Sequence, residues 1–334
     1  MEEIQRMVTW LPVLGRFTRV SFMGTGLKDD PTTLLSGFTG LIILMIPGNP
    51  GNEQFYAHFG QTILSKISRI MRISKENSLF CTISHLNHVP LPEKYSEMSI
   101  CSYSGTIFHY FYRVSLVDQI KYKFNFCIHY LPKTAKFILI GHSIGSYLML
   151  RILPDLLRHK FNVIRCIALF PTIEHMAESP NGERLLPWLK KCRNWDGFVQ
   201  IMLSWLRYLP DSVKEHICTF FMGNRCRYFP PCILQSAVEI VDVNVIRNII
   251  FMAMDELIAV SNLDESLLYH SNRCRFLYGT VDQWCPLRYA LEMQKRLGND
   301  LVIIDDKKCE HAFVLNHGEL VANEVVKWIS ECYD

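Results

Sequence analysis

The chain has 334 residues, a formal net charge of +3 and a hydrophobic fraction of 49%. A chain of this length and composition can bury a large core, which excludes wholesale disorder. The charge is only mildly basic and the sequence has no clustered arm of Lys and Arg, so we expect no nucleic-acid partner.

The N-terminus and the cysteines indicate a reducing compartment. Glu2 and Glu3 stand where a signal peptide requires basic residues, so no signal peptide is expected. The 12 cysteines form no CxxC pair, a spacing that favours reduced and mostly buried thiols. We expect no metal, because neither an HExxH motif nor a His/Cys cluster with zinc-ligand spacing occurs. The longest uncharged stretch, 31–52, contains too many polar residues for a transmembrane span.

Taken in chain order, short apolar runs that end at turn residues alternate with helical patterns. Strands are predicted at 7–24 (a pair around Gly15), 41–46, 79–84, 137–140, 163–170, 275–278 and 301–304. Helices are predicted at 53–73, 107–129, 144–157, 286–297 and from about 318. This alternation implies an α/β fold, with a mostly parallel central sheet and helices on both faces.

One stretch, 172–270, breaks the alternation. It has helical patterns and no clear strand before Arg275. We therefore predict a single domain, 1–334, with one helical insertion at 172–270 that acts as a lid.

The segment Gly141-His-Ser-Ile-Gly145 matches the pattern G-x-S-x-G. In this motif the serine lies on a sharp turn between a strand and a helix, which lifts its hydroxyl above the sheet. The flanking Gly141 and Gly145 suit the close approach of backbone that such a turn requires. An apolar strand precedes the motif and a helical pattern follows it, so Ser143 is the predicted nucleophile.

A serine hydroxyl is a weak nucleophile and needs a base that an acid orients. Enzymes with this serine turn keep the chain order Ser, then Asp or Glu, then His. Asp282 follows the predicted strand 275–278, and His311 follows 301–304. Both residues therefore belong to the sheet edge of Ser143, with His311 as base and Asp282 as acid.

Other acids and histidines are candidates for the same roles. Glu174 follows the strand before the insertion and is a rival acid. Asp305 and Asp306 lie too close in sequence to His311 to be comfortable partners. His142, inside the serine turn, is expected to pack or to line the pocket rather than to act as the base.

The oxyanion hole is expected to use two backbone N–H groups. One is that of Ile144, directly after the nucleophile. The other comes from the loop 47–52, where the prolines cannot donate and Gly48, Asn49 and Gly51 remain. Of these three we favour Asn49.

The insertion contains an apolar stripe with helical spacing, formed by Phe198, Met202, Trp205, Leu206 and Leu209. Two interpretations stay open: the stripe packs on the core, or it contacts a lipid surface or shapes an acyl pocket. The apolar stretch 240–260 reads as a second lid or core helix. An apolar lid weakly favours a lipid-like ester as the substrate.

Five segments together resemble the lipid-droplet-associated hydrolase family of the α/β-hydrolase superfamily. They are IPGNPG (46–51), LIGHSIGSY (139–147), FPTIEHMAESPNG (170–182), FLYGTVDQWCP (276–286) and EHAF (310–313). The resemblance covers roughly 40–315. It implies an α/β-hydrolase fold, a serine lipid hydrolase acting on sterol esters or related neutral lipids, and a place at lipid droplets and the cytosolic face of the endoplasmic reticulum. The motifs carry over Ser143, Asp282 and His311 as the catalytic triad.

The predicted reaction is a two-step acyl transfer to water, for which no cofactor is expected. The lid would contact the lipid-droplet or endoplasmic-reticulum surface. Two alternatives remain: a lipid-droplet binding or tethering protein that retains the fold with little activity, and an acyltransferase that uses the same serine.

Overall fold

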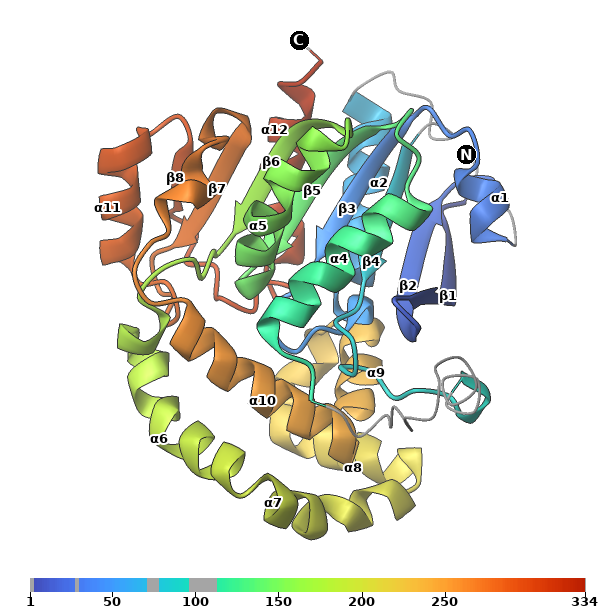
Figure 1. Ribbon diagram of the computed structural model, residues 1–334, viewed down its shortest axis with the longest axis vertical. Helices are drawn as coiled ribbons and strands as arrows, with labels where there is room; N and C mark the ends of the chain where they lie inside the picture. Colours follow the sequence, from blue (N-terminus) through green and yellow to red (C-terminus); the bar gives the residue numbers. More distant parts are fainter. Residues whose placement is uncertain (1–2, 28–29, 71–77, 96–112, 334) are drawn as a thin grey trace.

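An eight-stranded sheet forms the centre of the protein in the computed structural model, which describes residues 3–27, 30–70, 78–95 and 113–333 (Figure 1). The strands are β1 (Gln5–Val13), β2 (Arg16–Gly24), β3 (Leu41–Ile46), β4 (Ser78–Ile83), β5 (Lys136–His142), β6 (Asn162–Leu169), β7 (Cys274–Gly279) and β8 (Val302–Asp305). Their order in the sheet is β1-β2-β4-β3-β5-β6-β7-β8. From β4 to β8 all neighbours are parallel, so the mostly parallel sheet predicted from the sequence is confirmed.

The central strands are apolar along their whole length because helices cover both faces of the sheet. All six residues of β3 are buried. Ile43 lies opposite Phe80 of β4 and Ile138 of β5, so three buried side chains form one row across the sheet. This register brings the carboxyl ends of the strands to a common edge, where the loops that follow them meet.

The antiparallel edge begins with a hairpin. β1 pairs with β2, and Leu14 and Gly15, at the turn, have φ angles of 47° and 75°. Positive φ at both turn residues matches the right-handed twist of the two strands. The predicted pair of strands around Gly15 is therefore confirmed.

Helices α4 (Leu116–Tyr130) and α5 (Ile144–Arg158) cover one face of the sheet, and α2 (Ala57–Ile70) and α12 (Gly318–Ser330) cover the other (Figure 1). α11 (Leu287–Leu297) packs beside β7 and β8, and the short α1 (Pro31–Leu35) precedes β3. The helix predicted at 53–73 begins as the 3₁₀ helix η1 (Glu53–Tyr56), whose first turn is capped by the Asn52 side chain. The helix predicted at 107–129 begins at Leu116, and the part of it before residue 113 lies outside the described residues.

The stretch between β6 and β7 folds into helices, as its pattern predicts. They are α6 (Pro180–Asn194), α7 (Asp196–Leu203), α8 (Asp211–Met222), α9 (Pro231–Ile240) and α10 (Val243–Ala259). Short 3₁₀ helices connect α7 to α8 and α8 to α9. Together they lie across the edge of the sheet at which the parallel strands end (Figure 1). None of the helices in the described ranges combines the length and the apolarity that crossing a membrane requires.

The apolar stripe of 198–209 is not one continuous helix, in contrast to the expectation. α7 ends at Leu203 and a 3₁₀ helix, η4 (Ser204–Tyr208), follows it. Ser204 Oγ donates to the carbonyl oxygen of Ile201 at 2.8 Å, a side-chain bond that competes with regular helical hydrogen bonding. Pro210 follows and has no N–H to continue the helix.

Candidate active site

Ser143 lies on a tight turn between β5 and α5, at the sheet edge that the insertion covers. Its φ of 54° and ψ of −126° form a strained conformation for a residue with a side chain. A Cβ added to Gly141 would lie 2.5 Å from the carbonyl oxygen of Gly145, and one added to Gly145 would lie 2.2 Å from that of Ile46. Backbone crowding thus explains both glycines of the motif.

The structure brings Ser143, His311 and Asp282 together from three separate strand ends. His311 Nε2 lies 2.8 Å from Ser143 Oγ, and His311 Nδ1 lies 2.6 Å from Asp282 Oδ2. These distances allow the imidazole to take the hydroxyl proton while the carboxylate orients the ring.

Asp282 is almost fully buried, with 3% of its surface exposed, yet it is held in the ionised form. Burial opposes the charge, but the adjacent His311 and several hydrogen bonds outweigh it, so the pKa of the Asp282 carboxyl lies below its usual value. The backbone N–H groups of Trp284 and Cys285 donate to Oδ1 at 2.7 and 3.1 Å. An ionised, immobile carboxylate is the partner that a protonated His311 requires.

Cys285 is a member of this group that the sequence reasoning missed. Its Sγ lies 3.0 Å from Asp282 Oδ2 and 4.0 Å from His311 Nδ1. Burial and the Asp282 carboxylate raise the pKa of the Cys285 thiol well above its usual value, so the thiol stays protonated and donates to the carboxylate. Atoms of these three residues lie within 4.8 Å of one another, as metal ligands can, but here they are joined by hydrogen bonds among themselves. The spacing of Asp282 and Cys285, three residues apart in a turn, was the available signal.

The rival acids have other surroundings. Burial raises the pKa of Glu174, and the Nδ1 atom of His311 is already bonded to Asp282. Asp305 Oδ2 accepts the N–H of Cys309 at 2.8 Å, so this acid shapes the loop that leads to His311.

The loop after β3 runs beside Ser143. Gly48 N–H donates to Tyr56 Oη at 2.9 Å, and Gly51 N–H donates to His88 Nδ1 at 3.1 Å. The N–H of Asn49 has no acceptor among the described residues, and Ile144 opens α5, where N–H groups have no acceptor within the helix. These two backbone donors are the ones that the loop and the turn leave available.

A cavity of about 460 Å³ opens beside the Ser143 hydroxyl and the His311 ring. Pockets of roughly 300–1,000 Å³ are typical of sites that enclose small organic molecules. The walls are mostly apolar, and they include Phe55, Met176, Leu185, Leu189, Ile249 and Trp284. α6 and α10 supply part of these walls, so the insertion and the sheet build the cavity together.

Glu256 of α10 is the acidic residue in the cavity lining and was also missed by the sequence reasoning. Asn49 Nδ2 donates to Glu256 Oε1 at 3.0 Å and to the carbonyl oxygen of Ile249 at 3.1 Å. The side chain of Asn49 therefore ties the loop beside Ser143 to α10. The sequence around Glu256, an acid inside an apolar stretch, gave no sign of this contact.

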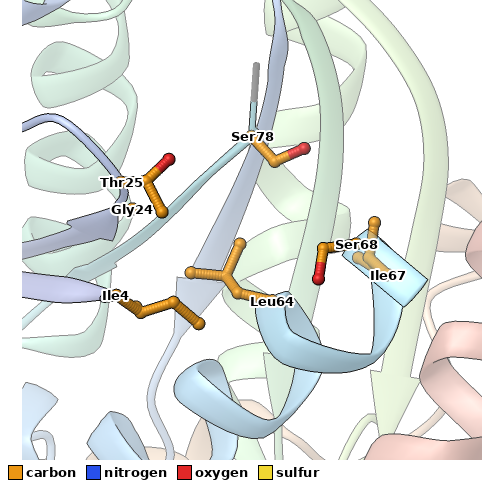
Figure 2. Close-up of a pocket in the computed structure, with 7 residues that line it drawn as sticks. All are labelled: Ile4, Gly24, Thr25, Leu64, Ile67, Ser68 and Ser78. Carbon is orange, nitrogen blue, oxygen red and sulfur yellow. The ribbon is translucent and has the colours of Figure 1, made fainter. Parts of the chain in front are cut away.

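A second cavity lies at the opposite edge of the sheet, between the ends of β1 and β2, α2 and the start of β4 (Figure 2). Its volume is about 10 Å³, which is roughly the room that one water molecule needs. It is too small for an acyl chain. The cavity beside Ser143 is the candidate substrate site, because it has room for an organic molecule and lies against the Ser143 hydroxyl and the His311 ring.

Most of the apolar stripe on the insertion faces solvent. Phe198, Met202 and Trp205 of the predicted stripe are exposed, and so are the neighbouring Ile201 and Tyr208. We call these five residues the lid stripe. Each is more than half exposed, and Ile201 and Tyr208 are exposed to 71% and 76%. Leu206, by contrast, is 7% exposed and packs inward. The core-packing interpretation therefore holds for Leu206 and not for the five residues of the lid stripe.

Comparisons with known proteins identify a family. Residues 39–314 match the family described as lipid-droplet associated hydrolase. The lipid droplet-associated hydrolase of Homo sapiens is 31% identical over 292 residues, which cover 85% of this chain and 83% of that protein. The lipid droplet-associated hydrolase of Drosophila melanogaster is 29% identical over 283 residues, covering 84% of this chain and 86% of that protein.

Solved structures show the same fold at much lower sequence identity. A bacterial membrane phospholipase A superposes with a TM-score of 0.57 at 12% identity, covering 98% of this chain and 87% of the other. A peroxisomal α/β-hydrolase of Saccharomyces cerevisiae superposes with a TM-score of 0.53 at 14% identity, covering 99% and 90% of the two chains. The fold is therefore that of the α/β-hydrolases.

Proposed function

The chain belongs to the lipid-droplet-associated hydrolase family, and from this premise we propose that it is a serine hydrolase that cleaves lipid esters through an acyl-enzyme on Ser143. The observation that carries the proposal is that His311 is hydrogen-bonded to both Ser143 and Asp282, and that Ser143 and His311 line an apolar cavity.

The first half-reaction transfers the acyl group to the enzyme. Ser143 Oγ attacks the ester carbonyl carbon while His311 Nε2 takes the hydroxyl proton. The carbonyl electron pair moves to oxygen and then returns, which breaks the bond to the alkoxy group. The imidazolium gives its proton to that alkoxy oxygen, and the alcohol leaves.

The second half-reaction releases the acid. His311 takes a proton from water, and the water oxygen forms a bond to the acyl carbon. The bond to Ser143 Oγ breaks, and the serine regains its proton from His311. Asp282 remains ionised throughout and stabilises the imidazolium.

The negative oxygen of each tetrahedral intermediate requires donors that are in place beforehand. We assign this role to the backbone N–H groups of Ile144 and Asn49. Removal of one such donor costs other hydrolases about a hundredfold to a thousandfold in kcat. Because both donors here are backbone groups, the conformations of the loop 47–52 and of the serine turn determine how well the N–H groups are aligned with the negative oxygen.

The apolar cavity supports sterol esters or related neutral lipids as the substrate class. The lid stripe supports contact with the monolayer of a lipid droplet or with the cytosolic face of the endoplasmic reticulum. A cationic side chain accompanies the lid stripe, because Arg207 lies over the ring of Tyr208.

Covalent labelling by a fluorophosphonate probe tests the proposal. We expect wild-type protein to be labelled, Ser143→Ala to be unlabelled, and Asp282→Asn and His311→Ala to react much more slowly. Release of free acid from a sterol ester or a glycerol ester, measured with and without an added alcohol acceptor, then identifies the product.

The alternatives predict different results. A well-folded wild type that is not labelled would contradict the hydrolase mechanism and favour the tethering protein, whose recruitment to droplets survives Ser143→Ala. A transesterified product in place of free acid would make the enzyme an acyltransferase.

A further inference from the structure

Three hydrogen bonds in series pass beside Ser143 and join the two loops that flank it. Gly48 N–H donates to Tyr56 Oη at 2.9 Å, and Tyr56 Oη lies 2.7 Å from His142 Nδ1. His142 Nε2 lies 2.8 Å from the carbonyl oxygen of His311. The series therefore begins in the loop that supplies the Asn49 donor and ends on the backbone of the residue assigned as the base.

The two ends determine the direction of each hydrogen bond in the series. A backbone N–H only donates, and a carbonyl oxygen only accepts. Tyr56 Oη accepts from Gly48 and has one proton to give, which goes to His142 Nδ1. His142 Nε2 then carries the ring proton and donates it to the carbonyl oxygen of His311. Because the pKa of His142 lies at about 3, the ring is neutral, so Nδ1 accepts, Nε2 donates and both nitrogens are hydrogen-bonded.

The surroundings keep His142 neutral and immobile. Burial, together with the nearby His311 ring, lowers the pKa of His142 to about 3. The ring packs edge-on against Phe313, with centroids 5.0 Å apart and an interplanar angle of 84°. Tyr56 is equally enclosed, with 3% of its surface exposed.

Gly48 allows the loop to approach this series closely. A Cβ added to Gly48 would lie 3.1 Å from Ser143 Cβ and 3.2 Å from His142 Nδ1. The loop therefore packs closely against the serine turn. A shift of the Tyr56 hydroxyl would change the direction in which the backbone N–H groups of the loop point.

We propose that Tyr56 and His142 are positioning residues that hold the oxyanion loop and the His311 loop at a constant separation across Ser143. This inference rests on the proposed function, because it assigns these loops to acyl transfer. Neither side chain transfers a proton to the substrate: Tyr56 aligns the Asn49 donor through Gly48, and His142 anchors the backbone of His311.

The neutral state of His142 matters for the same reaction. His311 becomes positively charged in the transition state, and its ring centroid lies 5.3 Å from that of His142. A second positive charge at this distance would disfavour protonation of His311 and weaken it as a base. A neutral hydrogen-bonding ring anchors the loop without this repulsion.

Steady-state kinetics of four variants on a soluble short-chain p-nitrophenyl ester test the inference. In Tyr56→Phe we expect kcat to fall about 10- to 100-fold, because a misplaced donor weakens only the transition state, and KM to stay within about twofold. In His142→Gln, which keeps an acceptor and a donor, we expect a higher kcat than in His142→Ala. Tyr122→Phe is the matched control, since its buried hydroxyl makes no hydrogen bond within the described residues, and we expect wild-type kinetics.

Three outcomes overturn the inference. They are a wild-type kcat in Tyr56→Phe, a raised KM with unchanged kcat, and equal kcat in His142→Gln and His142→Ala. Circular dichroism establishes that each variant is folded, and if Tyr56→Phe is not, the comparison of the two His142 variants decides. Failure of the proposed function would appear separately, as the absence of Ser143-dependent labelling in the wild type.

Discussion

At the scale of the residue, Glu256 is a carboxyl group in the wall of an apolar cavity. Burial raises its pKa to about 8, although the hydrogen bond from Asn49 acts in the opposite direction. Near neutral pH the group is therefore protonated and uncharged. An uncharged wall is compatible with a lipid ester in the cavity, whereas a carboxylate would repel the developing oxyanion and the acid product.

We predict that Glu256→Gln changes the dependence of stability on pH. In the native state the carboxyl keeps its proton up to about pH 8, whereas in the unfolded chain it loses the proton near its ordinary pKa of 4.5. The stability that this group contributes is therefore complete below pH 4.5 and is lost as the pH rises toward 8. Each pKa unit corresponds to about 1.4 kcal/mol, so the wild type should lose a few kcal/mol relative to the variant over this range.

Urea unfolding of both proteins at pH 5, 6.5 and 8 measures the difference. Glu319→Gln, at an exposed surface carboxyl, is the control and should follow the wild-type profile. A difference between wild type and Glu256→Gln that stays constant with pH would show that Glu256 titrates normally.

At the scale of the element, the segment formed by α7 and η4 exposes most of its large apolar side chains to solvent. Five large apolar side chains of the lid stripe lie on this segment and are more than half exposed. Phe220 and Phe221 of α8 are exposed to 81% and 82% and enlarge the apolar area contributed by the insertion. A solvent-exposed apolar area of this kind is typical of a surface that inserts into the boundary of a lipid layer.

We predict that replacing Phe198, Met202 and Trp205 together by Ser weakens binding to lipid-monolayer droplets about tenfold or more, because three apolar side chains lose their insertion into the lipid. Hydrolysis of a soluble short-chain ester should change much less. Co-flotation with artificial droplets and ester kinetics measure the two effects.

The control and the choice of residues follow from the exposure of the side chains. Val8→Ser, at an exposed position on β1, should leave co-flotation unchanged. Leu206 is not a suitable target, since it packs inward and its loss would disturb the fold. Unaltered co-flotation of the triple variant would exclude the lid stripe as the contact.

At the scale of the whole molecule, a buried ionic network connects the antiparallel edge of the sheet to the insertion. Arg19 of β2 lies 2.7 Å from Glu53 Oε1 and 2.6 Å from Glu239 Oε1 of α9. Asn52 Nδ2 also donates to Glu239, at 2.7 Å. Glu53 is fully buried, and Arg6 also contacts it, at 2.5 Å.

We predict that Arg19→Met lowers the free energy of unfolding by about 3–5 kcal/mol, because the buried carboxylate of Glu53 keeps only Arg6 among the described residues and Glu239 loses Arg19 as well. Lys295→Met removes an exposed pair with Glu292 and should cost much less stability, because water screens that pair. Urea unfolding at pH 7 compares the two. Equal costs would mean that the network contributes no more than a surface pair.

The chain order and local patterns were sufficient to predict much of this protein. The apolar run 41–46 coincides with β3, since a strand buried on both faces has no polar position to obscure its ends. Ser143, Asp282 and His311 were identified because each follows a strand, and parallel strands bring such positions to one edge. The break at Ser204 was missed, because helical spacing alone carries no information on side-chain bonds to the backbone.

The sequence by itself determined the α/β alternation, the serine turn and the three residues that meet there, because these depend on periodicity and on turns within short segments. Only the tertiary structure decided that Tyr56 reaches His142 and that Glu256 enters the cavity. It also decided that the lid stripe faces outward. These features join segments far apart in the chain or depend on which face of a helix is covered, and burial of that kind arises only when the whole fold is packed.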